Sequence, residues 1–477
     1  MNKVDIITAK IKKINQDISR MHSLREISDY IPAEGIEKFA FILLIVWNLS
    51  PILTMLHMTS FGQNTDQFAE MTTLLAKNIF WLTMLQQVGL IGCLLGILAL
   101  SKSIIRARTV QTRLGDYLTG HAFPIFLFLM LIWSVFSCLF SGDINLSFYG
   151  TLFRNEGLLA YICYAGIFIC AFQIKKARLV YGLLNCFTAI ATLISILSLI
   201  NSKLINQWFG LTQGASIFNN ENHYAYYLCL AIMASLYLLL RENQQIRRLA
   251  FRFAAFGLIC AALVINHSFG PYLAVLAGLA ITVIFVFKSQ KDKKLRLVLA
   301  VSLFLAISLV INLFFNYLFS DFGILLDDSM NILTGSADAA NAGSYRWFLW
   351  VNGLSFIAER PFFGFGPDNL GAQYLAAGTV IDRPHNELIQ FAASLGLPAL
   401  IFYLSALITL LISFIKQKWL TTLIGIGFFA MIATYLASSL LGNTMFYTTP
   451  YFLIILGLSG SLLKIRASDK DQYPGQQ

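Results

Sequence analysis

The chain has 477 residues, of which 57% are hydrophobic and only 12% are charged, and its formal net charge is +10. Soluble globular proteins carry about 25% charged residues, so this composition excludes a soluble protein of this length. It predicts an integral membrane protein whose main solvent is lipid. The positive charge does not indicate a nucleic-acid partner, because the basic residues follow the alternation expected of membrane topology.

Residues 1–37 precede the first apolar run and are predicted to form a cytoplasmic segment. Apolar side chains recur at helical spacing from Ile7 to Met21, beside Lys10 and Arg20. This pattern favours a basic amphipathic helix on the inner leaflet, although a solvated helix without a partner fits it as well. The first apolar run is too long and begins too late for a cleavable signal peptide.

Twelve apolar runs of spanning length follow within residues 38–464. The run at 252–266 is short, and its neighbour begins after only a few residues, so we expect the two to form a tight hairpin. The chain is therefore predicted to be all-α, a polytopic bundle of about twelve transmembrane helices, with a cytoplasmic tail at residues 465–477. The runs cover residues 39–59, 79–100, 122–140, 157–173, 179–200, 223–240, 252–266, 270–287, 297–319, 387–414, 419–437 and 447–463.

Lysine and arginine favour cytoplasmic loops, and here they strongly favour one set of loops. With the N-terminus inside, only six of the 34 basic residues fall on outside segments, which leaves 28 inside. Both termini are therefore predicted to be cytoplasmic, in a multi-pass protein of the cell membrane. No Asp or Glu lies near the middle of a predicted span, which counts against a proton- or ion-coupled transporter. The six outside residues are Lys77, Arg154, Lys203, Arg346, Arg360 and Arg383.

One outside segment, residues 320–386, is long and is predicted to be a large extracytoplasmic loop. Residues 344–359 are expected to form a helix that begins at a Ser344 cap and ends before Pro361. This helix carries Arg346, for which an alternative role is to reach lipid headgroups. The segment PFFGFGPDN at residues 361–369 is rich in turn residues.

The segment DRPHNE at residues 382–387 leads directly into the next span. Asp382 is predicted to cap that helix, with Pro384 in its first turn. His385 would then lie at the helix N-terminus, where the helix dipole disfavours imidazolium, so it is expected to be neutral as a general base must be. Arg383 and free backbone amides can hold phosphate oxygens there. An interfacial histidine and a lipid-anchoring arginine are the alternative interpretation.

Further polar residues on the outside segments are candidates for the same site. Arg154 lies beside Glu156, and an ion pair between them is the alternative role. Asn220 and Asn222 begin a span, where capping explains one of them, and Ser268 lies in the hairpin turn. The acidic residues beside His385 lack the HExxH spacing of a zinc site, so no metal is expected.

Four stretches, in this order along the chain, resemble the O-antigen ligase/polymerase superfamily of bacterial membrane glycosyltransferases. The resemblance covers roughly the C-terminal half, and the last two stretches are the more specific ones in combination. The hairpin of that family usually has Arg where this chain has Phe269, so one expected diphosphate contact is missing. The stretches are FNNENHYAYYL (218–228), HSFGPYLAVLAG (267–278), SYRWFLW to ERPFFGFGPDN (344–369) and RPHNELIQFAASLGLPAL (383–400).

The resemblance implies an enzyme with a glycan donor linked to undecaprenyl diphosphate at the outer face of the cytoplasmic membrane. The acceptor would be lipid A core, another carrier-linked glycan or a protein, and the step would need no metal or nucleotide cofactor. Arg346 would hold the carrier diphosphate, His385 would act on the acceptor hydroxyl, and Asn386 belongs to the His-Asn motif at the helix start. Arg154 or Arg383 would replace the missing hairpin arginine.

We therefore predict a surface polysaccharide polymerase or an O-antigen ligase, with the polymerase slightly favoured. A flippase or exporter of lipid-linked glycans is the rival from another class, and it predicts charged residues facing a cavity within the membrane. A non-enzymatic envelope scaffold is a third interpretation, but it leaves the clustered arginine and histidine residues without a role. Membrane lipids are expected to surround the bundle in every case.

Overall fold

The computed structural model describes residues 26, 30, 32–59, 67–110, 121–212, 214–218, 220–242 and 245–464. The amphipathic helix predicted near the N-terminus and the predicted tail at residues 465–477 lie outside these residues. Within them the chain is helical, and the only β-type pairing is an isolated bridge between Thr212 and Ser216. The all-α prediction is thus confirmed for the part of the chain described.

In the described part of the chain, eight helices are long and apolar enough to cross a membrane, or nine if α3 and α4, which are bent by 44° at their junction, form one broken span. Three further apolar helices, α9, α21 and α22, have 16, 17 and 14 residues. A helix of 14 residues rises only about 21 Å, short of the roughly 30 Å hydrocarbon layer, so a total of twelve spans stays a prediction. The bundle helices are α3 (Ala33–Asn48), α4 (Ser50–Met58), α5 (Gln67–Val110), α7 (Ala122–Leu139), α9 (Leu158–Gln173), α10 (Ala177–Ile200), α12 (Glu221–Arg241), α13 (Ile246–Asn266), α14 (Phe269–Ser289), α15 (Lys294–Phe315), α20 (Leu397–Lys416), α21 (Leu423–Ser439) and α22 (Thr449–Leu462).

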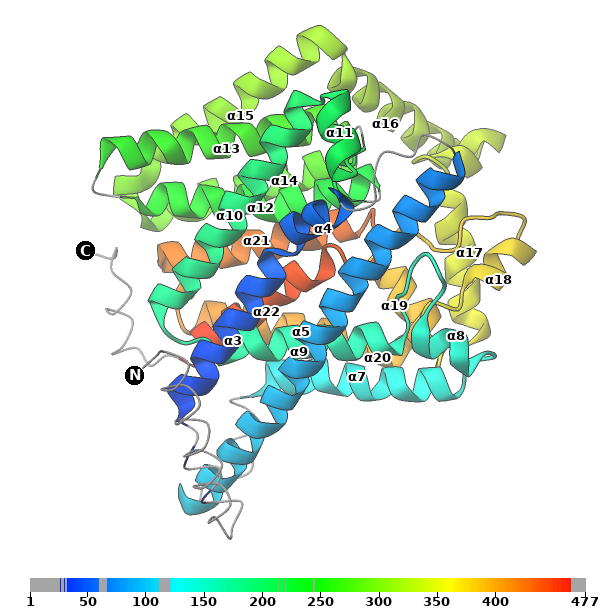
Figure 1. Cartoon of the computed structure of the whole chain (residues 1–477). Coiled ribbons are helices and arrows are strands. Elements are labelled where there is room, and N and C mark those ends of the chain that lie inside the picture. The colour runs from blue at the N-terminus through cyan, green and yellow to red at the C-terminus, as the bar shows by residue number, and fades with distance from the viewer. Residues whose placement is uncertain are drawn as a thin grey trace.

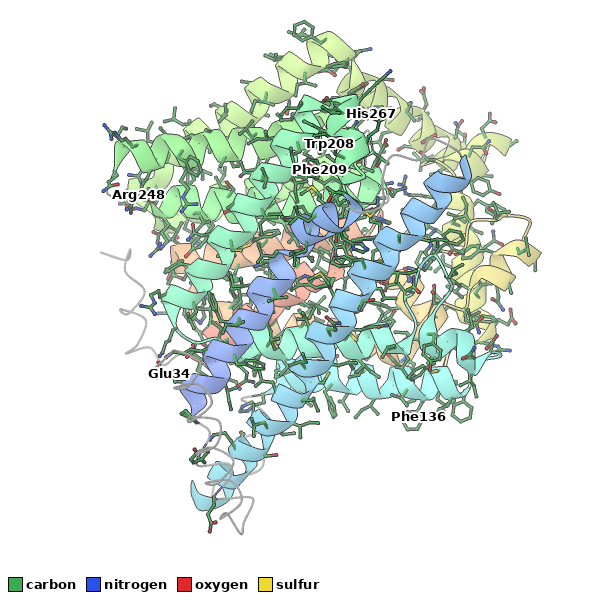
Figure 2. The ribbon with its side chains drawn as sticks, viewed as in Figure 1. Glu34, Phe136, Trp208, Phe209, Arg248 and His267 are labelled. Carbon is green, nitrogen blue, oxygen red and sulfur yellow. The ribbon has the colours of Figure 1, made fainter. Side chains whose placement is uncertain are left out.

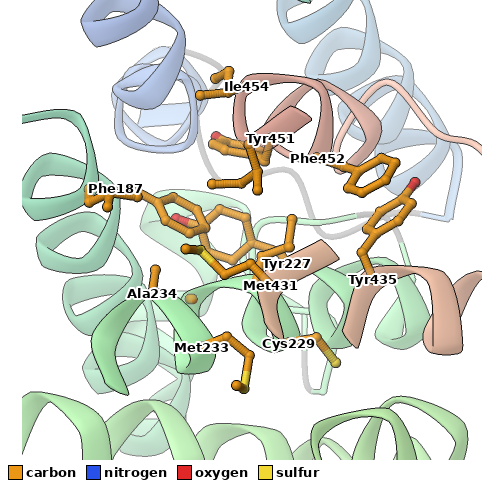
Figure 3. Packing of buried hydrophobic residues seen from close by; sticks show 14 of the residues in the cluster. Phe187, Tyr227, Cys229, Met233, Ala234, Met431, Tyr435, Tyr451, Phe452 and Ile454 are labelled. Atoms are coloured by element: carbon orange, nitrogen blue, oxygen red, sulfur yellow. The ribbon is translucent and has the colours of Figure 1, made fainter. Parts of the chain in front are cut away.

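The centre of the bundle is α12, whose spanning window is buried throughout, as expected of a helix that is apolar on all sides. Its Tyr227 lies between Phe187 of α10 and Tyr451 of α22, with ring centroids 5.1 and 5.0 Å away (Figure 3). Small residues allow other helices to approach closely. A Cβ on Gly166 of α9 would lie 1.8 Å from the carbonyl oxygen of Gly89 of α5.

Short helices cover one end of this bundle, and α8, α17, α18 and α19 lie together at the right of Figure 1. The predicted long loop contains α16, η3, α17 and α18, and its location outside the cell stays a prediction. The short turn of the predicted hairpin is confirmed, because α13 and α14 are joined only by His267 and Ser268, but the two helices pack mainly on other helices, α13 on α12 and α14 on α21. The short helices are α8 (Ile144–Tyr149), α11 (Lys203–Phe209), α16 (Tyr317–Thr334), η3 (Ala337–Asn341), α17 (Arg346–Glu359), α18 (Gly371–Ala376) and α19 (Glu387–Leu395), with η2 (Lys291–Lys293) and η4 (Trp419–Thr421) elsewhere.

Loops predicted to share the cytoplasmic side contact one another. Lys176, before α10, forms an ion pair of 2.7 Å with Glu34 of α3, and the Gln290 side chain donates to the backbone oxygen of Thr421 at 2.7 Å. The segments that carry Arg154, Arg383 and the α21–α22 loop likewise meet, as described below. These contacts agree with the predicted grouping of alternate loops on two sides of the bundle. Which of the two sides faces the cytoplasm stays a prediction.

Candidate active site

The helix that follows the DRPHNE segment begins later than predicted. Asn386 is its N-cap, and the side-chain oxygen accepts from the backbone nitrogens of Leu388 and Ile389 at 3.1 Å each. The predictions that Asp382 caps this helix and that Pro384 lies in its first turn are therefore wrong. His385 has a left-handed backbone, with φ of 51°, and it turns the chain into the extended Asn386 cap. The side-chain oxygen of Asn386 therefore has a structural role at the start of α19.

Asp382 instead forms a two-point ion pair with Arg154. The Nε and Nη2 atoms of Arg154 donate to the two carboxylate oxygens at 3.0 and 2.8 Å, and about a quarter of each side chain is exposed. Burial works against ionisation of Asp382, but the hydrogen bonds and charge of Arg154 outweigh it and hold its pKa below the usual value. The pair joins the loop before α9 to the segment before α19. The alternative pairing of Arg154 with Glu156 is wrong.

Glu156 lies deeper, with its Oε1 accepting from the hydroxyl of Tyr164. Its other oxygen is buried without a hydrogen-bond partner. Burial raises the pKa of this carboxyl to about 7, against the opposing charge of Arg383. Glu156 is therefore substantially protonated at neutral pH and contributes less than a full negative charge.

Arg383 is buried, with 2% of its side chain exposed, and it forms an ion pair of 2.5 Å with Asp368. It also donates to the backbone oxygen of Thr444 at 3.0 Å. Burial opposes its charge, but the attraction of Asp368 and other carboxylates outweighs this and raises the pKa of Arg383. The second oxygen of Asp368 accepts from the backbone nitrogen of Thr151 at 2.7 Å. Arg383 therefore connects three segments of the chain and does not lie open to a ligand.

The turn-rich segment at residues 361–369 positions Asp368, and its predicted turns are confirmed. The backbone nitrogens of Phe365 and Gly366 donate to the carbonyls of Ala393 and Ser394 at the end of α19, at 3.0 and 2.8 Å. Gly364 has φ of 62°, and a Cβ there would lie 2.4 Å from the Ser394 carbonyl oxygen. Glycine is therefore required at this position both by backbone conformation and by space.

His385 is half-buried, and positive charges surround it. Burial is the largest cause that lowers its pKa, to about 4, followed by the charges of Arg346 and Arg154, while Asp382 opposes them. The imidazole is therefore neutral at neutral pH, as expected from the sequence. The cause differs from the expected one, because His385 precedes the cap of α19 and the helix dipole is not needed to explain the shift.

Unlike Arg154 and Arg383, Arg346 forms no ion pair with a carboxylate among the described residues. It is half-buried at the first position of α17, where its Nη1 donates to the backbone oxygen of Gly343 at 2.9 Å. Its Nε is buried without a partner, and within the described part of the chain no Asp or Glu pairs with it. Its charge acts on His385, the other predicted catalytic residue, and lowers the pKa of that imidazole.

The turn before Arg346 also differs from the prediction. Ser344 and Tyr345 are both left-handed, with φ of 58° and 73°, and neither side chain caps α17. The predicted Ser344 cap is therefore wrong, although the helix ends at Glu359 as expected. Left-handed non-glycine residues cost about 1–3 kcal/mol each and concentrate at functional sites. The two in succession orient the first turn of α17, from which Arg346 extends.

The loop between α21 and α22, residues 440–448, supplies residues that the sequence analysis did not select. The Nδ2 atom of Asn443 lies 3.3 Å from the Nδ1 atom of His385, while the Oδ1 atom of Asn443 is buried without a partner. Thr444 accepts from Arg383 and from Gln390. The only signal in the sequence is a pair of polar residues, Asn443 and Thr444, between two apolar runs.

The remaining predicted residues have different surroundings. Asn220 caps α12 by accepting from the backbone nitrogen of Asn222 at 2.8 Å, which is the structural alternative considered above. The next residue, His223, stacks on Tyr447 with ring centroids 5.8 Å apart and is within electrostatic range of His385. Ser268 lines another pocket, which contains neither Arg346 nor His385.

The site thus combines a neutral imidazole, an unpaired guanidinium and two paired arginines. Among the described residues, no group of three His, Cys, Asp or Glu side chains is arranged to hold a metal ion. Comparison with known families shows that residues 254–404 match the family model described as O-antigen ligase. The match includes Arg346 and His385 but neither Arg154 nor Asn443. No curated protein matches the chain.

Proposed function

Because residues 254–404 match the family model described as O-antigen ligase, we propose that this chain belongs to the O-antigen ligase/polymerase superfamily and is a membrane glycosyltransferase. The enzyme transfers a glycan from undecaprenyl diphosphate to an acceptor hydroxyl at the outer face of the cytoplasmic membrane. The product is a surface polysaccharide, formed by polymerisation or by ligation.

The observation that carries the proposal is the pairing of an arginine without a counter-ion and a neutral histidine. Arg154 and Arg383 each hold an aspartate, whereas Arg346 holds only a carbonyl oxygen. A diphosphate supplies the negative charge that Arg346 lacks, through charge-assisted hydrogen bonds. His385, on which the charge of Arg346 acts, is then beside the reacting end of the donor.

In the proposed reaction, the acceptor hydroxyl oxygen attacks the anomeric carbon of the donor sugar. The bond from that carbon to the phosphate oxygen breaks, and undecaprenyl diphosphate leaves with the electron pair. His385 takes the hydroxyl proton, and Arg346 stabilises the charge that grows on the diphosphate. One such contact supplies about 3 kcal/mol, or roughly a hundredfold in rate.

The other predicted contacts take different roles in this proposal. Arg154 is partly exposed and its charge acts on His385. It is therefore the better replacement for the arginine that the family's hairpin carries where this chain has Phe269. Arg383 is a positioning residue, because its buried pair with Asp368 fixes the segment that carries His385. Asn386 positions the start of α19 through its cap.

The test uses purified protein in lipid nanodiscs with a synthetic undecaprenyl-diphosphate glycan and a hydroxyl acceptor. His385→Ala and Arg346→Ala are each expected to lose at least about a hundredfold in transfer rate. Arg360→Ala is the matched control, because this arginine follows the other end of α17 and its guanidinium lies over the Phe365 ring, 4.7 Å from the centroid. Normal transfer by both site variants would contradict the assignment.

Polymerase and ligase share the donor and differ in the acceptor, so a strain without the gene separates them. Loss of a polymerase leaves single repeat units on the cell surface, whereas loss of a ligase leaves full-length chains on the lipid carrier. Electrophoresis of surface polysaccharide distinguishes these outcomes. An unchanged polysaccharide pattern would exclude both reactions.

A further inference from the structure

Helix α16 leaves the bundle at the point where a membrane span ends. The candidate span at Lys291–Phe315 is followed by Asn316, whose left-handed backbone turns the chain, and α16 begins at the next residue. Figure 1 shows α16 turning away from α15 and running along the edge of the bundle toward α17. None of its residues is buried in the protein. The helix therefore begins where the span leaves the hydrocarbon layer.

One face of α16 is a stripe of large apolar side chains that point away from the protein. Successive members are three or four residues apart, so they share one face of the helix. Their side chains are between 52% and 81% exposed. The stripe consists of Phe319, Phe322, Leu326, Met330 and Leu333.

The opposite face of α16 is fixed to the protein at two points. Near its start, Asp321 lies 3.2 Å from the Nε2 atom of His267, and Tyr317 stacks on the same imidazole with centroids 4.1 Å apart. Figure 2 marks His267, on the turn that joins α13 to α14. Farther along, Asp328 accepts from the backbone nitrogen of Gly343 at 2.8 Å. These contacts set the rotation of the helix and direct the apolar stripe outward.

We propose that α16 lies on the membrane, with its stripe among the acyl chains of the leaflet at the active-site end of the bundle. The membrane is the occupant because α16 continues directly from a span whose last residues, Phe314 and Phe315, are themselves exposed. An exposed apolar stripe of this size marks an interaction surface, and an amphipathic helix beside a span meets the lipid interface. The helix has no lysine or arginine, so hydrophobic contact binds it.

This placement connects the membrane surface to Arg346. Gly343 donates its backbone N–H to Asp328 of α16 and accepts from the Arg346 guanidinium with its backbone oxygen. Two hydrogen bonds on one residue therefore link the lipid-facing helix to the unpaired cation. The helix holds that cation near the level of the lipid headgroups, where a lipid-linked diphosphate lies. The membrane contact itself does not depend on the glycosyltransferase assignment.

The test measures the surroundings of a nitroxide label on α16 in nanodiscs that hold one chain each. Leu326→Cys places the label on the stripe, and Asp327→Cys is the matched control at the same level of the helix but on another exposed face. Labels are attached in detergent before reconstitution, and the native chain, whose seven cysteines are buried or half-buried, gives the background. Collisions with lipid-soluble oxygen and with a water-soluble nickel complex are then compared.

The Leu326→Cys label is expected to show a several-fold higher ratio of oxygen to nickel collisions than the Asp327→Cys label. A nickel-dominated label at Leu326→Cys would place the stripe in water and overturn the proposal. Protection from both reagents would also overturn it, because protein would then cover the stripe. A second copy of the chain cannot cause protection when each nanodisc holds one.

Discussion

Asn443 lies against the imidazole of His385, and replacing it with aspartate is expected to raise the pKa of that imidazole. In Asn443→Asp a carboxylate would lie about 3.3 Å from the Nδ1 atom of His385, the distance now occupied by the amide. An opposite charge within about 4–6 Å shifts a pKa by about 1–3 units toward the charged form. The pKa of His385, now lowered to about 4, would therefore rise to between about 5 and 7.

The sign of the effect on activity follows from the role of the base. His385 must be neutral to accept a proton. If its pKa is raised, the imidazole becomes protonated, and activity is lost, at a higher pH as the solution is acidified. The acid limb of kcat/KM for glycan transfer, which reports the free enzyme, is expected to move up by about 1–3 pH units. Arg346, Arg154, Arg383 and Asp382 also face the imidazole and are unchanged in this variant.

Asn443→Leu is the matched control, because it removes the hydrogen bond without adding charge. Its rate is expected to fall by about tenfold, the equivalent of one net hydrogen bond. The acid limb of kcat/KM should stay close to the pH at which the native enzyme shows it. If the acid limb of Asn443→Asp coincides with that of the native enzyme, a charge at position 443 does not reach the group that acts as the base, and the reasoning fails.

Two further predictions concern the contacts that hold the site. Asp368→Asn leaves Arg383 buried without a counter-ion and is expected to lower the free energy of unfolding by about 3–5 kcal/mol. Thermal unfolding in detergent measures this, and a loss below about 1 kcal/mol would contradict a buried pair of this kind. Asp328→Ala removes the hydrogen bond to Gly343 and is expected to speed amide exchange there about tenfold or more, unlike Asp327→Ala.

The sequence predicted the helices well because hydrophobicity is a local property. Each predicted apolar run coincides with one helix or with a bent or adjacent pair, and the α13–α14 hairpin was expected from its spacing. Helices α9, α21 and α22 match their predicted runs to within a few residues, and polar residues near their ends lie inside the protein. Thr444, for example, follows the last turn of α21 and is buried by its contacts with Arg383 and Gln390.

The site could be predicted only where its functional residues belong to a motif within one segment of the sequence. Arg346 and His385 were selected from local motifs, and the charge of Arg346 acts on His385, while their catalytic roles stay a prediction. The predicted cap at Asp382 was wrong because a distant partner binds the same carboxylate. Asp382 pairs with Arg154, which is 228 residues away along the chain. Asn443 was missed for the same reason, since its role depends on His385, 58 residues away, and no local pattern marks it.

Counting charges around His385 leads to a final prediction about the order of events. Three arginines meet two paired aspartates, and Glu156, whose pKa is raised to about 7, compensates only in part, so Arg346 is left with a charge that the protein does not balance. A bound diphosphate balances it and thereby weakens one of the causes that lower the pKa of His385. If the proposed donor binds here, we expect the imidazole to become a stronger base only when that donor is in place.

This coupling has a kinetic signature, because kcat reports the enzyme–substrate complex and kcat/KM the free enzyme. The acid limb of kcat is expected at a higher pH than the acid limb of kcat/KM, since the donor raises the pKa of His385. In Arg346→Lys the cation remains, so the separation should persist even where the rate falls. In Arg346→Gln the acid limb of kcat/KM should itself move to a higher pH, because the free enzyme has lost a charge that lowers the pKa of His385. Coincident limbs in the native enzyme would show that donor binding leaves the imidazole unaffected, and the diphosphate would then have to lie elsewhere.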